Sequence, residues 1–558
     1  MTTLGQRAGT GALIFASLLL TVSTAAADSL AELPSDTATV RSGRRALATG
    51  AAAVAAGDTA QAAATFPLPT GRPYNIGRPA GLRHIWVDPR AGSDSRAGTG
   101  RATALRTLAA AWRRIPMSVR LSAGYHIHII RGSLPTTALP NYWENRWGSK
   151  AAPIIIEAAD GAGTVTLKAP VNVFNVSHLH LIGLTIRSAF DPFHCERCTN
   201  LLLRNVISEG ICTSWTDCGV QEAIKINQCR GVWIEGVVAG WANDNAFDCV
   251  SCQYGHIIDS RFHHSEWGVY LKGGSAYFLV ANNLITDHGS SGFAAGQGTG
   301  FEFMDRPWLQ YEAYDIKLVN NVIRNIEGAG FGVWGCYDCF YAHNTLISTG
   351  NRSHLVDIKF GEHSCDGDAA GCTANYNAGG WGPRSVGSVV SVPNRNVFIA
   401  NNLFYNPTGQ ESQWQQLQVD DPRQSGISRL GTVKADNNLV LRGNVFYNGG
   451  ADKPLGVGAG CPPINPTCNP TQLLAQNVFN KWRPDVSLST FRPASATGRL
   501  ATYSGLWRPL RNFGAWSPGN AVPAGNLTNL VRLDRAGVAR TASRNAPGAY
   551  VPPLRVVG

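Results

Sequence analysis

A short pattern of apolar strand residues, one Asn and two more apolar residues recurs along much of the chain. Two clear copies are Leu279-Val280-Ala281-Asn282-Asn283-Leu284-Ile285 and Lys317-Leu318-Val319-Asn320-Asn321-Val322-Ile323. The equivalent Asn positions are 205, 236, 260, 283, 321, 344, 402 and 444, with Gly236 and Ser260 in place of Asn in two copies. Several copies lie 23 or 24 residues apart. A fixed period of this length is typical of a solenoid, in which each repeat forms one coil.

The Asn residues explain why such coils would stack. Asn tolerates the left-handed backbone conformation of a tight turn, and its amide can bond to the Asn of the next coil. The flanking apolar pairs would fill the interior of each coil. An ordinary β-sandwich with Asn-containing turns is the alternative, but it does not explain a register kept over more than two hundred residues. The repeat therefore predicts an all-β parallel β-helix.

A second set of equivalent positions precedes the repeat strands and is rich in cysteine. Its members are Cys198, Cys229, Cys252, Ser275 and Cys336. Cys229 and Cys252 would lie in neighbouring coils, about 4.8 Å apart. A disulfide between them and a row of reduced thiols in the core are both consistent with this spacing. The pairs Cys195/Cys198, Cys249/Cys252 and Cys336/Cys339 have the Cys-x-x-Cys spacing, but whole coils separate them, which argues against zinc.

The chain divides into three regions by composition. Residues 1–27 have the features of a signal peptide, with Arg7, an apolar stretch and Ala25-Ala26-Ala27 before Asp28. Residues 28–80 are rich in Ala and Thr and are predicted to be a disordered linker. Residues 81–558 would form the β-helix, with insertions near 286–312 and 350–395. Thr107-Leu108-Ala109-Ala110-Ala111-Trp112 is predicted to be a helix that caps the first coil.

The cysteine content and the charge indicate where such a protein works. The chain has 13 cysteines, and we expect local disulfides between Cys212 and Cys218, between Cys365 and Cys372, and between Cys461 and Cys468. The signal peptide and these disulfides predict a secreted or periplasmic protein, and no later segment suggests a membrane span. The net charge of +11 fits either solubility alone or attraction to a polyanion. The scattered basic residues disfavour nucleic acid as the partner. We expect a monomer.

A candidate catalytic surface follows from the alternation of the strands before the cysteine positions. Aligning Ile224-Lys225-Ile226, Phe247-Asp248-Cys249, Val269-Tyr270-Leu271 and Phe301-Glu302-Phe303 points the first residue of each inward. The outer face then carries one row of candidate catalytic and binding residues. This row contains Lys225, Asp248, Tyr270 and Glu302, with Asn227 and Lys272 in a parallel row. Such close charged groups would shift one another's pKa values, as in a catalytic groove.

The turns before these strands supply further polar residues. Glu222 and Asp244 precede two of the strands, and Trp267 precedes a third. Together with Asp248, Glu222 and Asp244 could form an oxygen-rich calcium site. Turn-forming acidic residues on a polar outer face are the alternative. Calcium is the only cofactor that the sequence suggests.

The predicted insertions carry side chains suited to sugars. Arg306 could bind a carboxylate through two parallel hydrogen bonds. Trp308 and Tyr311 follow in the same insertion and could stack on sugar rings, as could Trp267 and Tyr270. The second insertion contains His354, Asp357, Lys359, Glu362, His363 and Asp366. We expect both insertions to flank the same groove.

The sequence resembles the pectate-lyase-like right-handed parallel β-helix superfamily. The resemblance rests on the repeat, on Val87-Asp88-Pro89, Gly92-Ser93-Asp94 and Gly98-Thr99, and on Lys272-Gly273-Gly274-Ser275. It extends to Leu533-Asp534-Arg535-Ala536-Gly537 and Pro547-Gly548-Ala549-Tyr550 near the end of the chain. It implies a secreted, carbohydrate-active protein on a right-handed β-helix, without fixing the activity, because the superfamily includes lyases, hydrolases, epimerases and phage tailspikes.

Three functions are consistent with the resemblance and the residues. The first is a lyase that cleaves a uronate-containing polysaccharide by β-elimination, with Lys225 or Lys272 as base and Arg306 as carboxylate partner. The second is a glycoside hydrolase that uses paired carboxylates such as Asp248 and Glu302. The third is a glycan-binding protein without catalytic activity. The basic charge and the lysines beside carboxylates favour the lyase.

Overall fold

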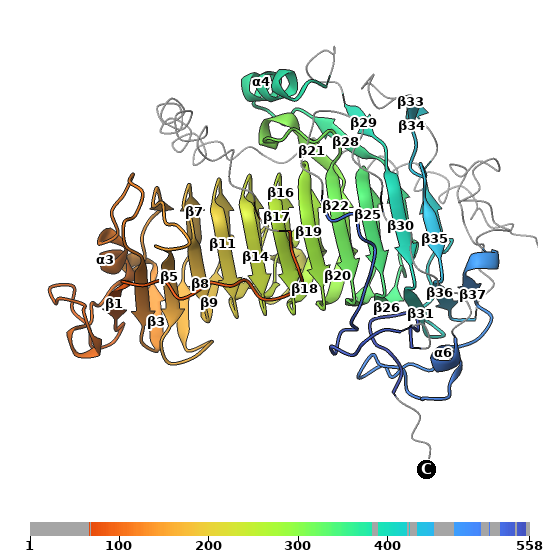
Figure 1. Ribbon diagram of the computed structural model, residues 1–558, viewed down its shortest axis with the longest axis horizontal. Coiled ribbons are helices and arrows are strands. Elements are labelled where there is room, and N and C mark those ends of the chain that lie inside the picture. The colour runs from red at the N-terminus through yellow and green to blue at the C-terminus, as the bar shows by residue number, and fades with distance from the viewer. Residues whose placement is uncertain are drawn as a thin grey trace, which may run out of the picture. The chain divides into compact units, whose positions relative to one another are not determined.

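A computed structural model describes residues 66, 68–381, 389–420, 423–424, 432–450, 474–503, 513, 525–541 and 544–553. The predicted signal peptide lies outside these residues. The described chain is built almost entirely from short parallel strands that stack coil upon coil, as Figure 1 shows. The parallel β-helix predicted from the repeat is therefore confirmed.

One sheet of twelve strands forms the first side of the β-helix, and every neighbouring pair in it is parallel. Its first six strands are β1 (Arg83–Val87), β2 (Tyr125–Ile129), β5 (Ile154–Ala158), β8 (Leu179–Ile182), β11 (Thr199–Arg204) and β14 (Arg230–Glu235). The others are β17 (Gln253–Ile258), β19 (Ser275–Ala281), β22 (Ala313–Val319), β25 (Cys336–Ala342), β30 (Arg395–Ala400) and β35 (Val440–Arg442).

The other two sides are stacks of strands that two long strands join into one sheet. β18 (Arg261–Lys272) and β20 (Leu284–Gly296) each run around a corner, so that their first parts belong to the second side and their last parts to the third. The second side also contains β3 (Gly132–Pro135), β6 (Val165–Lys168), β9 (Leu184–Ser188), β12 (Ile207–Gly210), β15 (Val238–Gly240), β23 (Val322–Ile326), β26 (Thr345–Thr349), β31 (Leu403–Asn406), β36 (Val445–Asn448) and β37 (Val478–Phe479). The third side contains β4 (Trp143–Glu144), β7 (Val171–Phe174), β10 (Phe193–Glu196), β13 (Ile224–Asn227), β16 (Asn245–Val250), β24 (Ala329–Trp334), β27 (Val356–Lys359) and β32 (Leu417–Val419).

A ladder of buried Asn side chains connects the later coils at the corner between the first and second sides. The Nδ2 of each Asn donates to the Oδ1 of the next at 2.8–3.0 Å. The ladder runs through Asn283, Asn321, Asn344, Asn402, Asn444 and Asn477. Ser260 stands in the same register, because its backbone N–H donates to Asn283 Oδ1. The predicted Asn row is thus confirmed from position 260 onward.

The earlier repeat positions 205 and 236 belong to the neighbouring row, so their predicted alignment is wrong by one residue. The strand pairings Ile207 with Val238 and Val238 with Arg261 place Val206 and Val237 in line with Ser260. Asn205 and Gly236 instead line up with Asp259 and Asn282, and all four of these residues have a positive φ between 52° and 61°. The two roles expected of one Asn are therefore divided between adjacent residues, one for the turn and one for the ladder.

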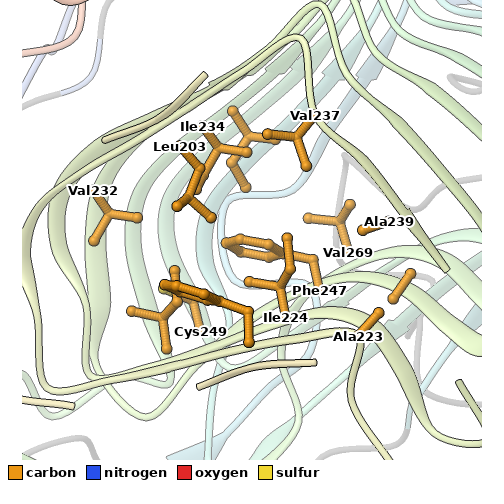
Figure 2. Packing of buried hydrophobic residues seen from close by; sticks show 14 of the residues in the cluster. Leu203, Ala223, Ile224, Val232, Ile234, Val237, Ala239, Phe247, Cys249 and Val269 are labelled. Atoms are coloured by element: carbon orange, nitrogen blue, oxygen red, sulfur yellow. The ribbon is translucent and has the colours of Figure 1, made fainter. Parts of the chain in front are cut away.

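The interior of the coils is filled by the inward residues of all three sides. Figure 2 shows Leu203, Ile234, Phe247, Ile224 and Val269 converging on this interior, and all five are at most 1% exposed. They belong to a continuous apolar cluster that extends from Ile85 to Phe446. Because burial of apolar side chains is the main favourable contribution to folding, this column stabilises the stack.

The cysteines of the repeat occupy the corner between the third side and the first. Cys198, Cys229, Cys252, Ser275 and Cys336 follow one another in the predicted order, as the pairings of the strands that begin beside them show. Disulfides join Cys249 to Cys252 and Cys336 to Cys339, so Cys252 does not pair with Cys229. Cys195, Cys198 and Cys229 are free and buried.

Two of the three predicted local disulfides are confirmed. They join Cys212 to Cys218 and Cys365 to Cys372. The third predicted disulfide, between Cys461 and Cys468, is not among the disulfides that the structure shows, because Cys461 and Cys468 both lie outside the described residues. The pairing of Cys468 with Cys461 therefore stays a prediction.

The first coil is capped as the sequence predicted. Helix α3 (Leu108–Arg113) begins after Thr107, whose side chain accepts a hydrogen bond from the Ala110 N–H, and it buries Leu108 and Trp112. The short helices η1 (Arg101–Thr103), η2 (Thr136–Ala138) and η3 (Trp215–Asp217) lie in connections of the early coils, and α6 (Arg499–Thr502) follows the last one.

Two segments without regular strands cover part of the outer face of the first side. Phe66 stacks on Tyr254 and Tyr74 on Trp233, with ring centroids 5.5 and 5.0 Å apart. Phe66 and Tyr74 are thus packed against the β-helix, so the prediction of a disordered linker to residue 80 is wrong for this part of the segment. Near the other end of the chain, Lys317 Nζ donates to the Thr528 carbonyl at 2.7 Å.

Both insertions are shorter than predicted and leave from the same corner. β20 continues to Gly296, so the first insertion begins at residue 297 and contains β21 (Gly298–Gly300) and η4 (Phe301–Phe303). β27 extends to Lys359, so the second begins at residue 360 and contains β28 (Gly361–Ser364), α4 (Ala369–Gly379) and β29 (Val390–Val392). β21 pairs with β28 and β28 with β29, so the two insertions form one small sheet. Strands β33 (Arg423–Gln424) and β34 (Thr432–Val433) make a separate hairpin.

Among the residues that the structure describes, no helix is long and apolar enough to cross a membrane.

The Asn ladder gives a direct test of what holds the coils in register. Replacing Asn344 by Ala removes the acceptor of the Asn321 N–H and Nδ2 donors and the donor to Asn402. Buried polar groups without partners cost about 1–3 kcal/mol each, so we expect Asn344→Ala to lower the stability by at least about 2 kcal/mol. Denaturant unfolding measures this. The control Asn141→Ala changes an exposed Asn and should have little effect; equal stability of the two variants would contradict the ladder's role.

Candidate active site

A row of polar side chains crosses four strands on the outer face of the third side. The strand pairings place His194 beside Lys225, Lys225 beside Asp248 and Asp248 beside Tyr270. The predicted alignment of Lys225, Asp248 and Tyr270 is therefore confirmed. Lys272, two residues beyond Tyr270 on β18, faces the same way as Tyr270 and lines up with Val250.

Glu302 does not belong to this row, and its predicted place there is wrong. The strand after β18 is the last part of β20, which puts Ala294 beside Tyr270. The alignment failed because Gly-Phe occurs twice, at 292–293 and 300–301, and the coil uses the first copy. Glu302 lies instead in η4, where its Oε1 accepts hydrogen bonds from the N–H groups of Asp366 and Asp368. It joins the two insertions to each other.

Lys225 lies between two carboxylates at the centre of the row. Its Nζ lies 2.9 Å from Glu222 Oε1 and also contacts Asp248 Oδ2. Burial opposes the charged ammonium, but Asp248 and Glu222 outweigh it and raise the pKa of Lys225 above its ordinary value. Lys225 is thus held as a cation, which makes it an electrostatic partner of the carboxylates and a poor base.

Asp244 is the carboxyl group that the cluster perturbs most clearly. Burial and the nearby Glu222 and Asp248 carboxylates raise the pKa of Asp244 to about 6, although Lys272 and Lys225 oppose the shift. Burial also raises the pKa of Glu222. An acid with a pKa near 6 can hold or release a proton close to neutral pH, as general acids and bases do.

The carboxylates have the chemistry of a calcium site. Glu222, Asp244 and Asp248 offer only hard oxygen ligands, which Ca²⁺ prefers. Asp248 is fully buried, and its Oδ1 lacks a hydrogen-bond partner, as does the buried Asn245 Oδ1. A bound cation would satisfy such oxygens and relieve the repulsion that raises the pKa of Asp244. The Lys225 ammonium already neutralises part of this charge, so calcium would bind in competition with it.

Lys272 differs from Lys225 in its surroundings. No carboxylate of the described residues lies within ion-pair distance of its Nζ. The Nζ lies over the Tyr270 ring, 4.6 Å from the centroid. The turn that follows it is fixed from the first insertion, because Glu312 Oε2 accepts a hydrogen bond from the Gly273 N–H at 2.8 Å. Glu312 is itself buried, and its Oε1 lies 2.6 Å from His363 Nδ1 of the second insertion.

Aromatic rings continue the surface beyond Lys272. Trp267 stacks on Tyr270 with an interplanar angle of 10°, and the edge of Trp334 meets Trp267 at 5.4 Å between centroids. Trp267 and Trp334 are half-buried, whereas Tyr270 is only 2% exposed. Lys359 Nζ lies 5.2 Å from the centre of Trp334 and 3.0 Å from Asp357 Oδ2. Trp334 was not among the residues predicted from the sequence to bind sugar, because its strand, β24, was not included in the alignment of the strands that carry Lys225, Asp248 and Tyr270.

The remaining residues predicted to bind sugar lie in the inserted unit. Tyr311 is 1% exposed and packs on Tyr337, and Trp308 meets Trp381 edge to face. Tyr311 therefore belongs to a core, and its predicted role in stacking on sugar is wrong. Arg306 is exposed, and its carbonyl accepts a hydrogen bond from Arg230 of the first side. Because Arg230 begins β14, directly after the strand of Lys225, this contact places Arg306 at the corner between the third side and the first.

The family comparison agrees with this architecture. The family model described as a right handed beta helix region matches residues 171–357, which span β7 to β27 and hence the whole row. The chain is a right-handed parallel β-helix protein, as the resemblance in the sequence implied.

Several solved structures resemble the chain but share little sequence with it. A crystal structure of pectate lyase Pel9A is 13% identical, with a TM-score of 0.43, over 85% of this chain and 97% of that one. The A-module of Azotobacter vinelandii mannuronan C-5 epimerase AlgE6 is 11% identical, with a TM-score of 0.38, over 60% and 88%. A GH136 lacto-N-biosidase from Eubacterium ramulus is 11% identical, with a TM-score of 0.31, over 65% and 67%. A comparison with curated proteins found no significant match.

The raised pKa of Asp244 makes the stability depend on pH. Because the folded state holds this proton more tightly than the unfolded state, stability falls as the pH rises from about 4 to about 6. We expect Asp244→Asn to flatten this part of the curve and to stabilise the protein at pH 7 by up to about 2 kcal/mol. Melting curves between pH 4 and pH 7 measure it. Asp259→Asn, at an exposed position, is the control. If Asp244→Asn kept the wild-type dependence of stability on pH, the assignment of this dependence to Asp244 would be contradicted.

Proposed function

We propose that the protein is a carbohydrate-active enzyme that cleaves a uronate-containing polysaccharide by β-elimination, with Lys272 as the base. The observation that carries the proposal is the environment of Lys272, an amine on an aromatic surface beside the carboxylate cluster, with no carboxylate of the described residues within ion-pair distance. The net charge of +11 favours approach of a polyanion.

The chemistry assigned to Lys272 is one proton transfer. Its neutral Nζ accepts the proton from C5 of the uronate, the electrons of that bond form the C4–C5 double bond, and the C4–O bond to the next sugar breaks. The leaving oxygen takes up a proton from water, and Lys272 later returns its proton to the solvent.

The groups around Lys272 hold the sugar and balance its charge. Trp267 and Trp334 offer half-buried ring surfaces for stacking on sugar rings, and Lys225 places a fixed positive charge in the row. Glu222, Asp244 and Asp248 would hold calcium. A bound calcium ion would supply positive charge that offsets the substrate carboxylate and so makes the C5 proton more acidic.

The proposal includes export from the cytoplasm. Four disulfides among the described residues support it, since disulfides persist in oxidising compartments.

Hydrolysis is the second candidate, and the raised pKa of Asp244 favours it. A carboxylic acid that keeps its proton near pH 6, beside the charged Asp248, has the properties of the acid in a carboxylate pair. The predicted pair of Asp248 and Glu302 is not favoured, because the Glu302 carboxylate lies in η4 and accepts hydrogen bonds from the Asp366 and Asp368 N–H groups. Asp244 and Asp248 would replace it.

Lys272→Ala tests the base. Incubation with pectate, alginate and other polyuronates should give ultraviolet-absorbing unsaturated products with the wild type, and at least about a hundredfold lower rate with the variant. The control Lys168→Ala removes an exposed lysine of the second side and should keep full activity. New reducing ends without absorbance would establish hydrolysis instead. Full lyase activity in Lys272→Ala would exclude Lys272 as the base.

Trp267→Ala tests the aromatic surface separately from the chemistry. Loss of ring stacking should raise the dissociation constant for a polyuronate oligosaccharide about tenfold, as measured by calorimetry with catalytically inactive Lys272→Ala as the parent protein. Tyr142→Ala, at a 57% exposed ring remote in sequence from the row, should not change binding. Unchanged affinity in Trp267→Ala would show that the sugar binds elsewhere.

A further inference from the structure

Three histidines gather on the outer face of the first side, at the start of the β-helix. The register of β1 and β2 sets His84 beside His126 and Trp86 beside His128. On the next strand, β5, Glu157 stands beside His128. The side chains therefore come from three adjacent strands of the first coils, on a different side of the β-helix from the row of Lys225.

The ring nitrogens of these histidines point toward one another. His84 Nδ1 lies 2.8 Å from His128 Nε2, and His126 Nε2 lies 2.8 Å from Glu157 Oε2. One ligand atom from each of the three histidines lies within 4.8 Å of the others. Neighbouring ligand nitrogens of a tetrahedral metal ion with bonds of about 2.0–2.1 Å are about 3.3 Å apart. Small side-chain movements would thus place the three imidazole donors around one ion, with Glu157 Oε2 next to His126 Nε2.

The cluster is open to solvent. The side chains of His126 and Glu157 are 16% and 38% exposed, so an ion can reach them.

One cation lies close enough to oppose a metal ion. The Arg101 guanidinium stands 5.3 Å from the centre of the ring of Trp86, the residue beside His128. Arg101 is itself paired with Asp160, which offsets part of its charge.

We propose that His84, His126, His128 and Glu157 bind one divalent transition-metal ion of the zinc type. Three imidazole nitrogens and one carboxylate oxygen are ligands that Zn²⁺ accepts in tetrahedral sites. The hard ions Ca²⁺ and Mg²⁺ prefer oxygen and are not expected here. Because its ligands lie on β1, β2 and β5, the ion would tie the first three strands of this side together. It would stabilise the end of the β-helix, where the first coil has a neighbour on one side only.

Zinc titration of the untagged full-length protein tests the proposal. In the presence of excess calcium, we expect one equivalent of Zn²⁺ to bind and to raise the melting temperature, since a ligand of the folded state stabilises it. The double variant His126→Ala/His128→Ala should bind this equivalent at least about tenfold more weakly and lose the rise in melting temperature. Replacing Zn²⁺ by Co²⁺ should give the visible absorption of tetrahedral coordination in the wild type alone.

Two further variants keep the test decisive. His84→Ala removes the most exposed ligand and should weaken zinc binding with the least effect on folding. His264→Ala is the matched control, because it breaks another close pair of imidazoles, His263 and His264, and should leave zinc binding unchanged. Unaltered binding in both His84→Ala and the double variant, or equal loss in His264→Ala, would overturn the proposal.

Discussion

The structure depends on the register between successive coils. Each strand pairs in parallel with the equivalent strand of the next coil, and the Asn ladder from Asn283 to Asn477 holds that register through buried side-chain hydrogen bonds. A strand that slipped by one residue would turn its whole apolar face outward. In the earlier coils Val206 and Val237 replace the ladder residues and pack in the core. Hydrogen bonding thus fixes the register of the later coils, and apolar packing fixes that of the earlier ones.

The same register builds the candidate site from residues far apart in sequence. Lys225, Asp248 and Tyr270 lie in one row only because β13, β16 and β18 are stacked in register, one strand spacing apart. The outer face of the first side is partly covered by the segments near residues 66–80 and 525–541, whereas the row lies on the third side. The two insertions pack on each other at the corner beside Lys272, and Glu312 links them to the turn at Gly273. The arrangement of the candidate site is therefore a consequence of coil stacking.

The features predicted correctly from the sequence are those that follow from its repeat period. The Asn positions from 260 to 444, the cysteine register, two local disulfides and the row of Lys225, Asp248 and Tyr270 all follow from equal spacing and strand alternation. The errors lie where the period breaks. Because Gly-Phe occurs a second time after the coil, the alignment wrongly placed Glu302 in the row. The turn role and the ladder role that were both assigned to one Asn belong to two adjacent residues. Tyr311 and Trp308 could not be placed, because the packing of the inserted unit depends on contacts between two separate insertions. The close approach of Lys225 to Glu222 and Asp248 likewise depends on side-chain geometry.

In the function proposed above, coil stacking assembles one sugar-binding catalytic surface around Lys272. A crystal structure of Lys272→Ala with a bound polyuronate oligosaccharide tests this directly. We expect sugar rings along the third side, over Trp267 and Trp334, with C5 of one uronate facing the position of the missing amine. An oligosaccharide bound on another side of the β-helix, or one whose C5 atoms all point away from residue 272, would contradict the proposed role of this surface.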